Sequence, residues 1–147
     1  MIAKDIMTKD VHMIAPDADV RAAARIMAEA GISALPVVGK DQALLGIVSE
    51  GDLVRRVELR TARRRSWWLE LFTTPETMAK DYIKEHATKV RDVMTSPVIS
   101  IGERMPLAEI AALLARHRIK RAPVLSGGAV VGIVSRADLV KALAKQS

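Results

Sequence analysis

Two copies of one short motif hold the side chains best suited to binding a ligand. Each copy reads Gly-x-x-Ser-x-x-Asp, with Ser49 and Asp52 in the first copy and Ser135 and Asp138 in the second. An apolar run precedes each serine, so the motif predicts the end of a strand followed by the start of a helix. Free N–H groups at a helix start attract anions, a serine hydroxyl can bind a phosphate oxygen, and an aspartate can accept both hydroxyls of a ribose. The motif therefore predicts a site for a phosphorylated nucleoside.

The same residues also have a purely structural interpretation. A serine followed three positions later by an acidic residue is close to a helix capping box, in which both side chains bind amides of the first turn. From the motif alone this interpretation is at least as well supported as ligand binding, and the two roles are compatible. The opening glycine, Gly46 or Gly132, is expected to let a ligand ring approach the backbone closely.

The motif belongs to a longer internal repeat. Asp-x-Met-Thr segments, called openers below, end at Thr8 and Thr95, and Pro-Val pairs begin at Pro36 and Pro123. The copies are 87 residues apart up to the Pro-Val pairs and 86 residues apart afterwards, so one residue is lost in the turn Lys40–Leu45. Such a repeat constrains the architecture before any single residue is interpreted, and it suggests that ligand sites come in pairs.

Each repeat predicts the order strand, helix, strand, strand, helix. Apolar residues at i, i+3, i+4 and i+7 begin at Val20 in the first copy and at Leu107 in the second, so both helices should bury the same stripe. Asp17 or Asp19 can cap the first helix, and Pro106 suits the first turn of its counterpart. The other predicted elements are strands at Val11–Ala15, Leu35–Val38, Leu44–Val48, Val98–Ile101, Pro123–Leu125 and Val130–Val134, and helices at Asp52–Val57 and Ala137–Ala144.

The predicted fold class is α/β, with two pseudo-symmetric β-α-β-β-α repeats packed sheet to sheet as one module. One repeat of about 50 residues is too small to bury its own sheet well, which is why the two should share a core. We expect the first repeat at residues 1–57, a helical insert at 58–89 and the second repeat at 90–147. The insert holds Trp67 and Trp68 beside basic residues and should pack on the body or on a second subunit.

Composition limits the function classes. The chain of 147 residues has no cysteine, which excludes disulfides and thiolate chemistry. Neither a secretory leader nor an apolar run of roughly 18 residues is visible, so a cytoplasmic protein without a membrane span is expected. The three histidines lack metal-ligand spacing, and the sequence has neither a nucleophile elbow nor a Walker loop. We therefore expect no metal site and no enzymatic activity.

The charge pattern indicates an anionic partner, because the net charge is +6 and the pI is about 10.0. Six arginines lie between Arg55 and Arg65, and we favour a solvated helix face for them. A nucleic-acid-binding or scaffold protein acting through Arg55–Arg65 is the alternative. A second basic tract runs from Arg116 to Arg121, whereas the first copy has no cation from Ala30 to Val37. Cations at a helix end can simply complement its dipole, but beside a phosphate-type motif they favour ligand binding.

In their order and spacing, the openers, Pro-Val pairs and Gly-x-x-Ser-x-x-Asp motifs resemble a tandem pair of cystathionine β-synthase (CBS) domains. This Bateman module, here of the standalone prokaryotic type with an insert, covers nearly the whole chain except the spacer. The resemblance implies a regulatory module for an adenine nucleotide, with AMP as first choice and ATP, ADP or NAD(H) next. It also implies a homodimer that signals to an unknown effector protein.

The resemblance further implies two clefts in which the aspartate holds ribose, the serine contacts phosphate, and adenine rests against an opener and a Pro-Val strand. The first expected site comprises Ser135, Asp138, Arg136, Lys120, Arg121, Thr95, Pro97, Val98, Ala122, Pro123 and Ile133. The second, weaker site comprises Ser49, Asp52, Thr8, Val11, Leu35, Pro36 and Ile47. Because only the second repeat has the basic tract, the Asp138 cleft should prefer a phosphorylated ligand. The Asp52 cleft is expected to be weaker, empty or suited to a less charged adenosyl compound.

Overall fold

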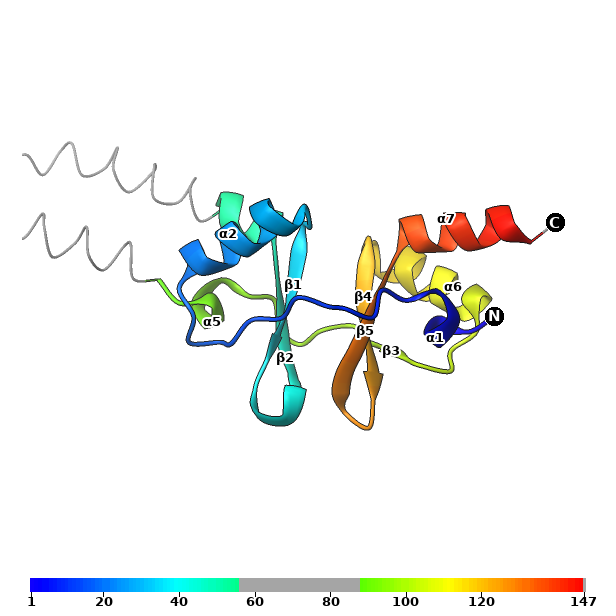
Figure 1. Cartoon of the computed structure of the whole chain (residues 1–147), viewed down its shortest axis with the longest axis horizontal. Coiled ribbons are helices and arrows are strands. Elements are labelled where there is room, and N and C mark those ends of the chain that lie inside the picture. The colour runs from blue at the N-terminus through cyan, green and yellow to red at the C-terminus, as the bar shows by residue number, and fades with distance from the viewer. Residues whose placement is uncertain (56–87, 147) are drawn as a thin grey trace, which may run out of the picture. The chain divides into compact units, whose positions relative to one another are not determined.

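The computed structural model describes residues 1–55 and 88–146, and the chain divides into two compact units. Unit 1 comprises Met1–Met13, Val38–Leu45 and Pro97–Ser147, and unit 2 comprises Ile14–Val37 and Gly46–Ser96. Each unit therefore combines the start of one sequence repeat with most of the other, as the colours of Figure 1 show. The predicted insert, including its tryptophans, lies outside the described residues except at positions 88–89.

Unit 1 is built on a three-stranded sheet in the order β3-β4-β5. Strand β3 (Ile101–Gly102) runs parallel to β4 (Arg121–Ser126), and β5 (Ala129–Ser135) runs antiparallel to β4. Gly127 and Gly128 join β4 to β5, and both have positive φ, as a two-residue type I′ hairpin turn requires. The unit also contains α1 (Ala3–Ile6), the 3₁₀ turn η1 (Lys40–Gln42), α6 (Leu107–His117) and α7 (Arg136–Lys145).

Unit 2 is built on the hairpin of β1 (Ala34–Val38) and β2 (Leu44–Ser49). The turn of this hairpin, Val38–Leu45, belongs to unit 1. Helix α2 (Val20–Ala30) precedes β1, and residues 50–55 form the described part of the helix that follows β2. The short helix α5 (Val90–Val93) comes from the start of the second repeat. Within the described residues the α/β class is thus confirmed.

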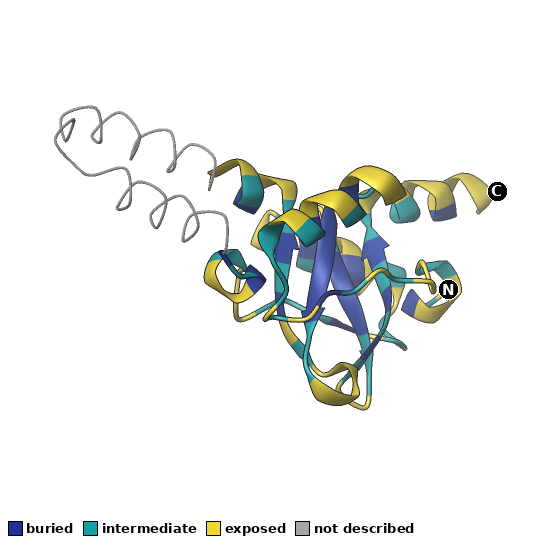
Figure 2. Ribbon diagram, turned by 60° about the vertical axis from the view of Figure 1, so that its left-hand side comes forward, coloured by how far each residue is buried: buried dark blue, intermediate teal, exposed yellow. Residues whose placement is uncertain are grey.

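Each unit has its own hydrophobic core, visible in Figure 2 as buried strands beneath helices whose outer faces are exposed. The predicted helix stripes are confirmed in part, because Ala23 and Met27 of α2 and Ile110 and Leu114 of α6 are buried. The i+4 members of both stripes, Ala24 and Ala111, are exposed. The core of unit 1 consists of Ala3, Ile101, Ile110, Leu114, Ala122, Val124 and Val134. The core of unit 2 consists of Ile14, Ala23, Met27, Leu35, Val37, Val48 and Val90.

The strand predicted at the start of each repeat is wrong in extent. At Val11–Ala15 only Ile14 pairs, through a single parallel bridge to Val37. The amide of Val11 instead binds the carbonyl of Lys9 at 3.0 Å, a local turn that cannot extend a ladder. The strand predicted at Val98–Ile101 is displaced to β3, where only two residues pair before the chain turns.

Asp19, rather than Asp17, caps α2. The Asp19 Oδ1 atom accepts a 2.8 Å hydrogen bond from the amide of Arg21, which satisfies one of the free donors of the first turn. Asp17 instead forms an exposed ion pair with Arg91 at 2.6 Å. The two carboxylates therefore have different tasks, one closing the start of α2 and the other binding the segment that carries α5.

Candidate functional site

Each opener forms backbone hydrogen bonds with the motif strand of the other repeat. The amide of Thr8 donates to the carbonyl of Ile133 at 2.9 Å, and the reverse bond is 3.1 Å long. Thr95 and Ile47 form the same pair of backbone hydrogen bonds, 2.8 and 3.0 Å long. Thr8 therefore belongs to the unit that holds Asp138, and Thr95 to the unit that holds Asp52. The structure thus brings Thr95 to Asp52 and Thr8 to the unit of Asp138, whereas the sequence analysis listed Thr95 with the Asp138 site and Thr8 with the Asp52 site.

The residues that follow the two openers differ in how they compare with the predicted grouping. Val11 lies in unit 1 rather than with Asp52, because the boundary between the units comes after Met13. Pro97 and Val98 lie in unit 1 with Asp138, as predicted, because the unit boundary follows Ser96. An opener and the segment after it are therefore divided between units in different ways in the two copies.

The glycine of each motif makes room for an opener rather than for a ligand ring. A Cβ atom on Gly46 would lie 2.6 Å from Met94 Sδ and 2.9 Å from the carbonyl oxygen of Thr95. A Cβ atom on Gly132 would lie 3.0 Å from the carbonyl oxygen of Thr8 and would also overlap Met7. The expected ligand contact at these glycines is therefore replaced by close backbone packing within the protein.

Ser135 and Asp138 form a complete capping box at the start of α7. Asp138 Oδ2 accepts hydrogen bonds from the amide of Ser135 at 2.8 Å and from its hydroxyl at 3.0 Å. The Ser135 hydroxyl in turn accepts from the amide of Asp138 at 3.2 Å. The structural interpretation is thus confirmed, but it uses one carboxylate oxygen only. Asp138 Oδ1 has no hydrogen-bond partner within residues 1–55 and 88–146, and the residue is half-buried.

The start of α7 has few amides left for an anion. The amide of Arg136 donates to the carbonyl of Lys120 at 2.9 Å, and those of Ser135 and Asp138 are used by the capping box. Of the first-turn amides, that of Ala137 has no partner in the described part of the chain. Side chains, rather than the helix start alone, must therefore provide most contacts to a phosphate group.

The register of unit 1 brings several predicted site residues to one face of its sheet. Arg121 lies opposite Ser135, and Pro123 lies opposite Ile133. Thr8 continues this second row, because it forms an antiparallel bridge with Ile133. Directly opposed residues of antiparallel strands have side chains on the same face, and residues two apart along a strand share that face. Arg121 and Ser135 thus form one row beside Asp138, and the Pro123–Ile133–Thr8 row follows.

Some predicted contact residues are buried and others are accessible. Ala122 and Leu35 are completely buried in the cores of their units. Ala122 lies on the opposite face of the unit 1 sheet from Arg121 and Pro123. Pro123 and Pro36 are also fully buried. The exposed members are Thr8, Thr95, Pro97, Lys120 and Arg136, and the half-buried ones are Val11, Ile47, Ser49, Val98, Arg121, Ile133 and Ser135.

Asp52 repeats the capping geometry but is occupied by additional partners. Its Oδ2 atom accepts from the amide and hydroxyl of Ser49 at 2.9 and 3.0 Å. Its Oδ1 atom accepts from Arg55 at 2.5 Å and from the Thr95 hydroxyl at 3.5 Å. The Asp52 side chain is only 4% exposed. Both of its oxygens are therefore already engaged, in contrast to those of Asp138.

Arg55 was missed as a partner of Asp52 by the sequence interpretation, which counted it only with the arginine cluster Arg55–Arg65. Its spacing of three from Asp52 on a helix was the available signal, since residues at i and i+3 are neighbours on a helix surface. Lys141 occupies the equivalent position in unit 1 but forms no ion pair with any described residue. The remainder of the Arg55–Arg65 cluster lies mostly outside the described residues.

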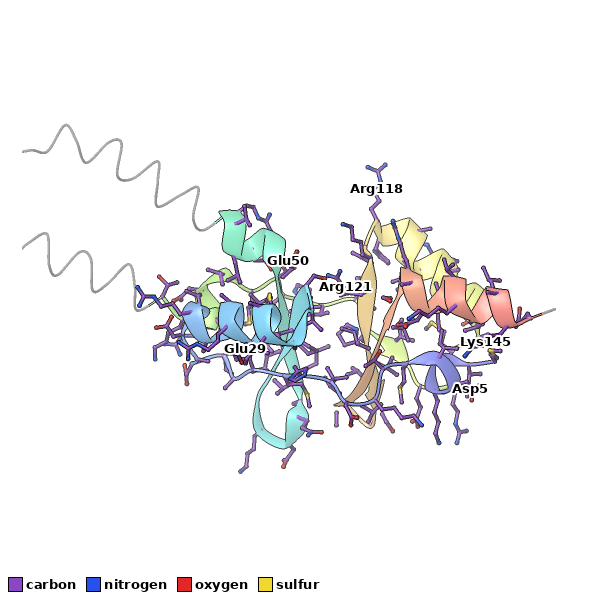
Figure 3. All side chains as sticks on the ribbon, turned by 45° about the horizontal axis from the view of Figure 1, so that its top comes forward. Asp5, Glu29, Glu50, Arg118, Arg121 and Lys145 are labelled. Carbon is purple, nitrogen blue, oxygen red and sulfur yellow. The ribbon has the colours of Figure 1, made fainter. Side chains whose placement is uncertain are left out.

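Among the described residues, no counter-charge pairs with the basic tract of unit 1. Arg116, Arg118 and Lys120 are exposed and Arg121 is half-buried. None of them, and not Arg136, forms an ion pair with residues of the described ranges. Figure 3 shows Arg118 and Arg121 at the β4 end of unit 1, with the Arg118 side chain extending away from the ribbon. Of these cations, Arg121 pairs across the sheet with Ser135 and Arg136 lies two residues before Asp138, so both lie at the motif, and neither has an ion-pair partner among the described residues.

Residues 1–55 and 88–146 contain no group of three histidine, cysteine, aspartate or glutamate side chains that could hold a metal ion. None of their helices combines the length and apolar character needed to cross a bilayer. The strongest candidate site is therefore the Asp138 face of unit 1, called the unit 1 site below and defined by Asp138, Ser135, Arg136, Lys120 and Arg121.

Comparison with known proteins agrees with these features. The chain is 35% identical to the uncharacterized protein MJ1426 of Methanocaldococcus jannaschii, over 97% of this chain and 91% of that protein. Its fold is similar to that of CBSX2, solved in complex with AMP, with a TM-score of 0.76, 24% identity and coverage of 98% and 96%. It is also similar to the CBS domain pair of protein MJ0100, solved with 5′-methylthioadenosine and S-adenosyl-L-methionine, with a TM-score of 0.74, 21% identity and coverage of 100% and 98%.

The family assignment comes from the sequence as well as from the fold. The model of the CBS domain family matches residues 3–59 and again residues 90–145. The two matches follow the sequence repeats and together span most of the chain. The chain therefore belongs to the CBS domain family and carries a tandem pair of its domains.

Proposed function

We propose that this protein is a regulatory module that binds an adenine nucleotide at the unit 1 site, with AMP as first choice and ATP, ADP or NAD(H) next. Asp138 Oδ1 would accept the ribose hydroxyls, while Ser135, Arg136, Lys120 and Arg121 would contact the phosphate. In the Pro123–Ile133–Thr8 row, Pro123 is buried, while the half-buried Ile133 and the exposed Thr8 could contact the base. The opener of the first repeat, rather than that of the second, thus completes the site.

The observation that carries this proposal is the free Oδ1 atom of Asp138 beside cations that have no partner within the described residues. A carboxylate that used both oxygens for capping would have nothing left for a ribose. Cations without a counter-charge attract an anionic ligand. Charge-assisted hydrogen bonds to phosphate are also stronger than neutral ones. Ligand binding should therefore stabilise unit 1 in particular.

The adenosine class is supported by the ligands of proteins with the same fold, AMP in CBSX2 and two adenosyl compounds in the MJ0100 pair. A regulatory role fits the two CBS domains that the family model matches at residues 3–59 and 90–145. We extend the proposal to a homodimer that passes ligand occupancy to an effector protein. Val140 and Leu143 of α7, each 64% exposed, offer an apolar surface to a second copy.

Calorimetric titration with AMP, ADP, ATP and NADH tests the proposal directly, with GMP and ribose 5-phosphate as controls for the base. A ligand at 100 times its dissociation constant should raise the free energy of unfolding by about 2.7 kcal/mol, which a thermal melt detects. Asp138→Asn keeps an acceptor for the capping box but removes the charge and one ribose acceptor, so it should lose most of this shift. Asp52→Asn is the matched control and should keep it.

Stability separates the two roles of the aspartate. If Asp138→Asn leaves the melting temperature of the free protein nearly unchanged and still binds AMP as tightly as the original chain, the ribose assignment is wrong. If none of the adenine nucleotides shifts the melting temperature of the unaltered protein at millimolar concentration, the proposed function itself is wrong. Copurification of an adenine nucleotide with the protein would support it independently.

A further inference from the structure

Each opener places its methionine against the motif glycine of the other repeat. In unit 2, a Cβ atom on Gly46 would lie 2.6 Å from the Sδ atom of Met94 and 3.1 Å from its Cγ atom. In unit 1, a Cβ atom on Gly132 would overlap the Sδ atom of Met7 and would lie 2.8 Å from its Cγ atom. The thioether group of each methionine therefore fills the space that the side chain of any residue other than glycine would need.

The same two methionines end the short helix of each opener. The amide of Met7 donates to the carbonyl of Ala3, and the amide of Met94 donates to the carbonyl of Val90, each at 2.9 Å. Ala3 and Val90 are completely buried. The methionine side chains pack against the hydrophobic cores of units 1 and 2. A change in either side chain would therefore disturb a helix end and a core contact at once.

The residue after each methionine carries the backbone bonds that hold the opener. Thr8 exchanges two hydrogen bonds with Ile133, and Thr95 exchanges two with Ile47. The carbonyl oxygen of each threonine lies close to the same point as the methionine sulfur, 3.0 Å from the added Cβ position in unit 1 and 2.9 Å in unit 2. A carbonyl oxygen can only accept a hydrogen bond, so it would repel an oxygen atom added to that sulfur.

Partial exposure makes these two sulfurs accessible to an oxidant. The chain has no cysteine, so methionine supplies all of its sulfur chemistry. Met27 is only 5% exposed and is protected by the core, whereas Met1 is 53% exposed at the chain terminus. Met7 and Met94 are half-buried. They therefore combine access from solvent with packing that an added oxygen atom would disrupt.

We propose that Met7 and Met94 are oxidation sites at which a hydroperoxide releases the openers. The thioether sulfur attacks one peroxide oxygen, so that an S–O bond forms while the O–O bond breaks. The sulfur is oxidised to the sulfoxide, and the departing oxygen takes up a proton and leaves as water or an alcohol. Methionine sulfoxide is polar, and sulfoxide reductases return it to the thioether, so the release is reversible.

The consequence for unit 1 connects this modification to ligand binding. Oxidation of Met7 should free Thr8 from Ile133, and both of these residues belong to the row that we propose for contact with the base. Oxidised protein should therefore bind AMP more weakly. Only this consequence rests on the proposed function, because release of the openers can be measured without any ligand.

Treatment of the full chain with hydrogen peroxide tests the proposal. Peptide mass spectrometry should find sulfoxide at Met7 and Met94 well before it appears at Met27. Hydrogen exchange at the amides of Thr8 and Thr95 should then become faster by about tenfold or more, because their backbone bonds are lost. The AMP affinity should fall by about tenfold. Methionine sulfoxide reductases should restore both the slow exchange and the affinity.

Oxidation-resistant variants identify which sulfurs are responsible. Met7→Leu with Met94→Leu keeps similar side-chain volumes, so this double variant should fold and keep slow exchange at the openers after peroxide treatment. Met105→Leu is the matched control. Met105 is also half-buried and packs on the core of unit 1, but it is not among the nearest neighbours of any described glycine. The control variant should respond to peroxide as the unaltered chain does.

Several results would overturn the proposal. One is unchanged exchange at Thr8 and Thr95 once Met7 and Met94 are oxidised. Another is resistance of both methionines to peroxide as complete as that of Met27. A double variant whose openers are still released by peroxide would also refute it. If peroxide releases the openers but the unoxidised protein binds no AMP, the proposed function fails while the oxidation sites stand.

Discussion

The hydroxyl of Thr95 lies 3.5 Å from Oδ1 of Asp52, although the two residues are 43 positions apart and belong to different sequence repeats. Thr95 ends the opener of the second repeat, and Asp52 closes the motif of the first. The Thr95 main chain binds Ile47 as well, so the opener is attached to unit 2 by both its backbone and its side chain. Each motif is therefore completed by the opener of the other repeat.

Replacing Arg55 should test how much of the stability of the Asp52 cluster depends on its ion pair. Arg55 is 69% exposed, so solvent screens the pair, and Arg55→Ala should cost about 0.2–1 kcal/mol of unfolding free energy. Asp52→Ala should cost more, about 0.5–2 kcal/mol for the capping interaction alone. Chemical denaturation of the two variants measures the difference. A larger loss in Arg55→Ala than in Asp52→Ala would contradict the proposed order.

A methyl group on either motif glycine should destabilise the protein. Gly46→Ala and Gly132→Ala place Cβ against the carbonyl oxygens of Thr95 and Thr8, so we expect a cost of about 1–3 kcal/mol for overpacking. Gly102→Ala is the control, because its added Cβ would meet no atom within 4 Å. Urea unfolding should separate the motif variants from the control. Equal stability of all three would mean that the openers do not pack on the glycines as described.

Helices α6 and α2 both end at a residue with left-handed backbone conformation, Arg118 and Gly31. Substitutions at these two residues should have opposite effects on stability. Arg118→Gly should raise the unfolding free energy by about 1 kcal/mol, because glycine removes the steric cost at φ of 53°. Gly31→Ala should lower it by a similar amount at φ of 65°, although its Cβ would meet open space. Thermal melts of both variants check this. Since Arg118 extends away from its unit in Figure 3, its loss should affect AMP binding less than the loss of Arg121.

The homodimer proposal predicts that a charge on α7 breaks the association. Val140→Asp or Leu143→Asp replaces a side chain that is 64% exposed, so neither should harm the folded chain. Burial of the same surface against a second copy would make either charge costly in the dimer. Sedimentation velocity should then show a shift towards the monomer. Val54→Asp, at an exposed apolar residue of unit 2, is a control that should leave the dimer intact if α7 forms the interface.

Local features of the fold followed from the sequence wherever one physical rule dominated. The buried i+3 and i+7 positions of α2 and α6 follow from apolar spacing, whereas the i+4 alanines are exposed. The β4–β5 turn follows from the two glycines at 127 and 128. The capping box of Ser135 and Asp138 likewise follows from two residues that are three positions apart. Each of these features depends on residues that are neighbours in the chain.

Features that depend on distant residues were harder to predict. Nothing in the order of the motifs tells which opener pairs with Ile133, since Thr8 and Thr95 carry equivalent segments. The reversed grouping of these residues follows from that ambiguity. The role of the motif glycines was likewise hidden, because a close approach can be made by a ligand or by the protein's own backbone. The strands predicted at the repeat starts were wrong in extent, because an alternating apolar pattern does not show whether a neighbouring strand is available for pairing.

The pairing of each opener with the other repeat determines what would happen if the chain were cut in two. Residues 1–55 supply the opener of unit 1 and most of unit 2, whereas residues 88–146 supply the opener of unit 2 and most of unit 1. Neither half-protein alone contains a finished unit. Cutting the spacer should therefore leave two fragments that need each other to fold, so that complementation on mixing, rather than independent refolding, would be their mode of recovery.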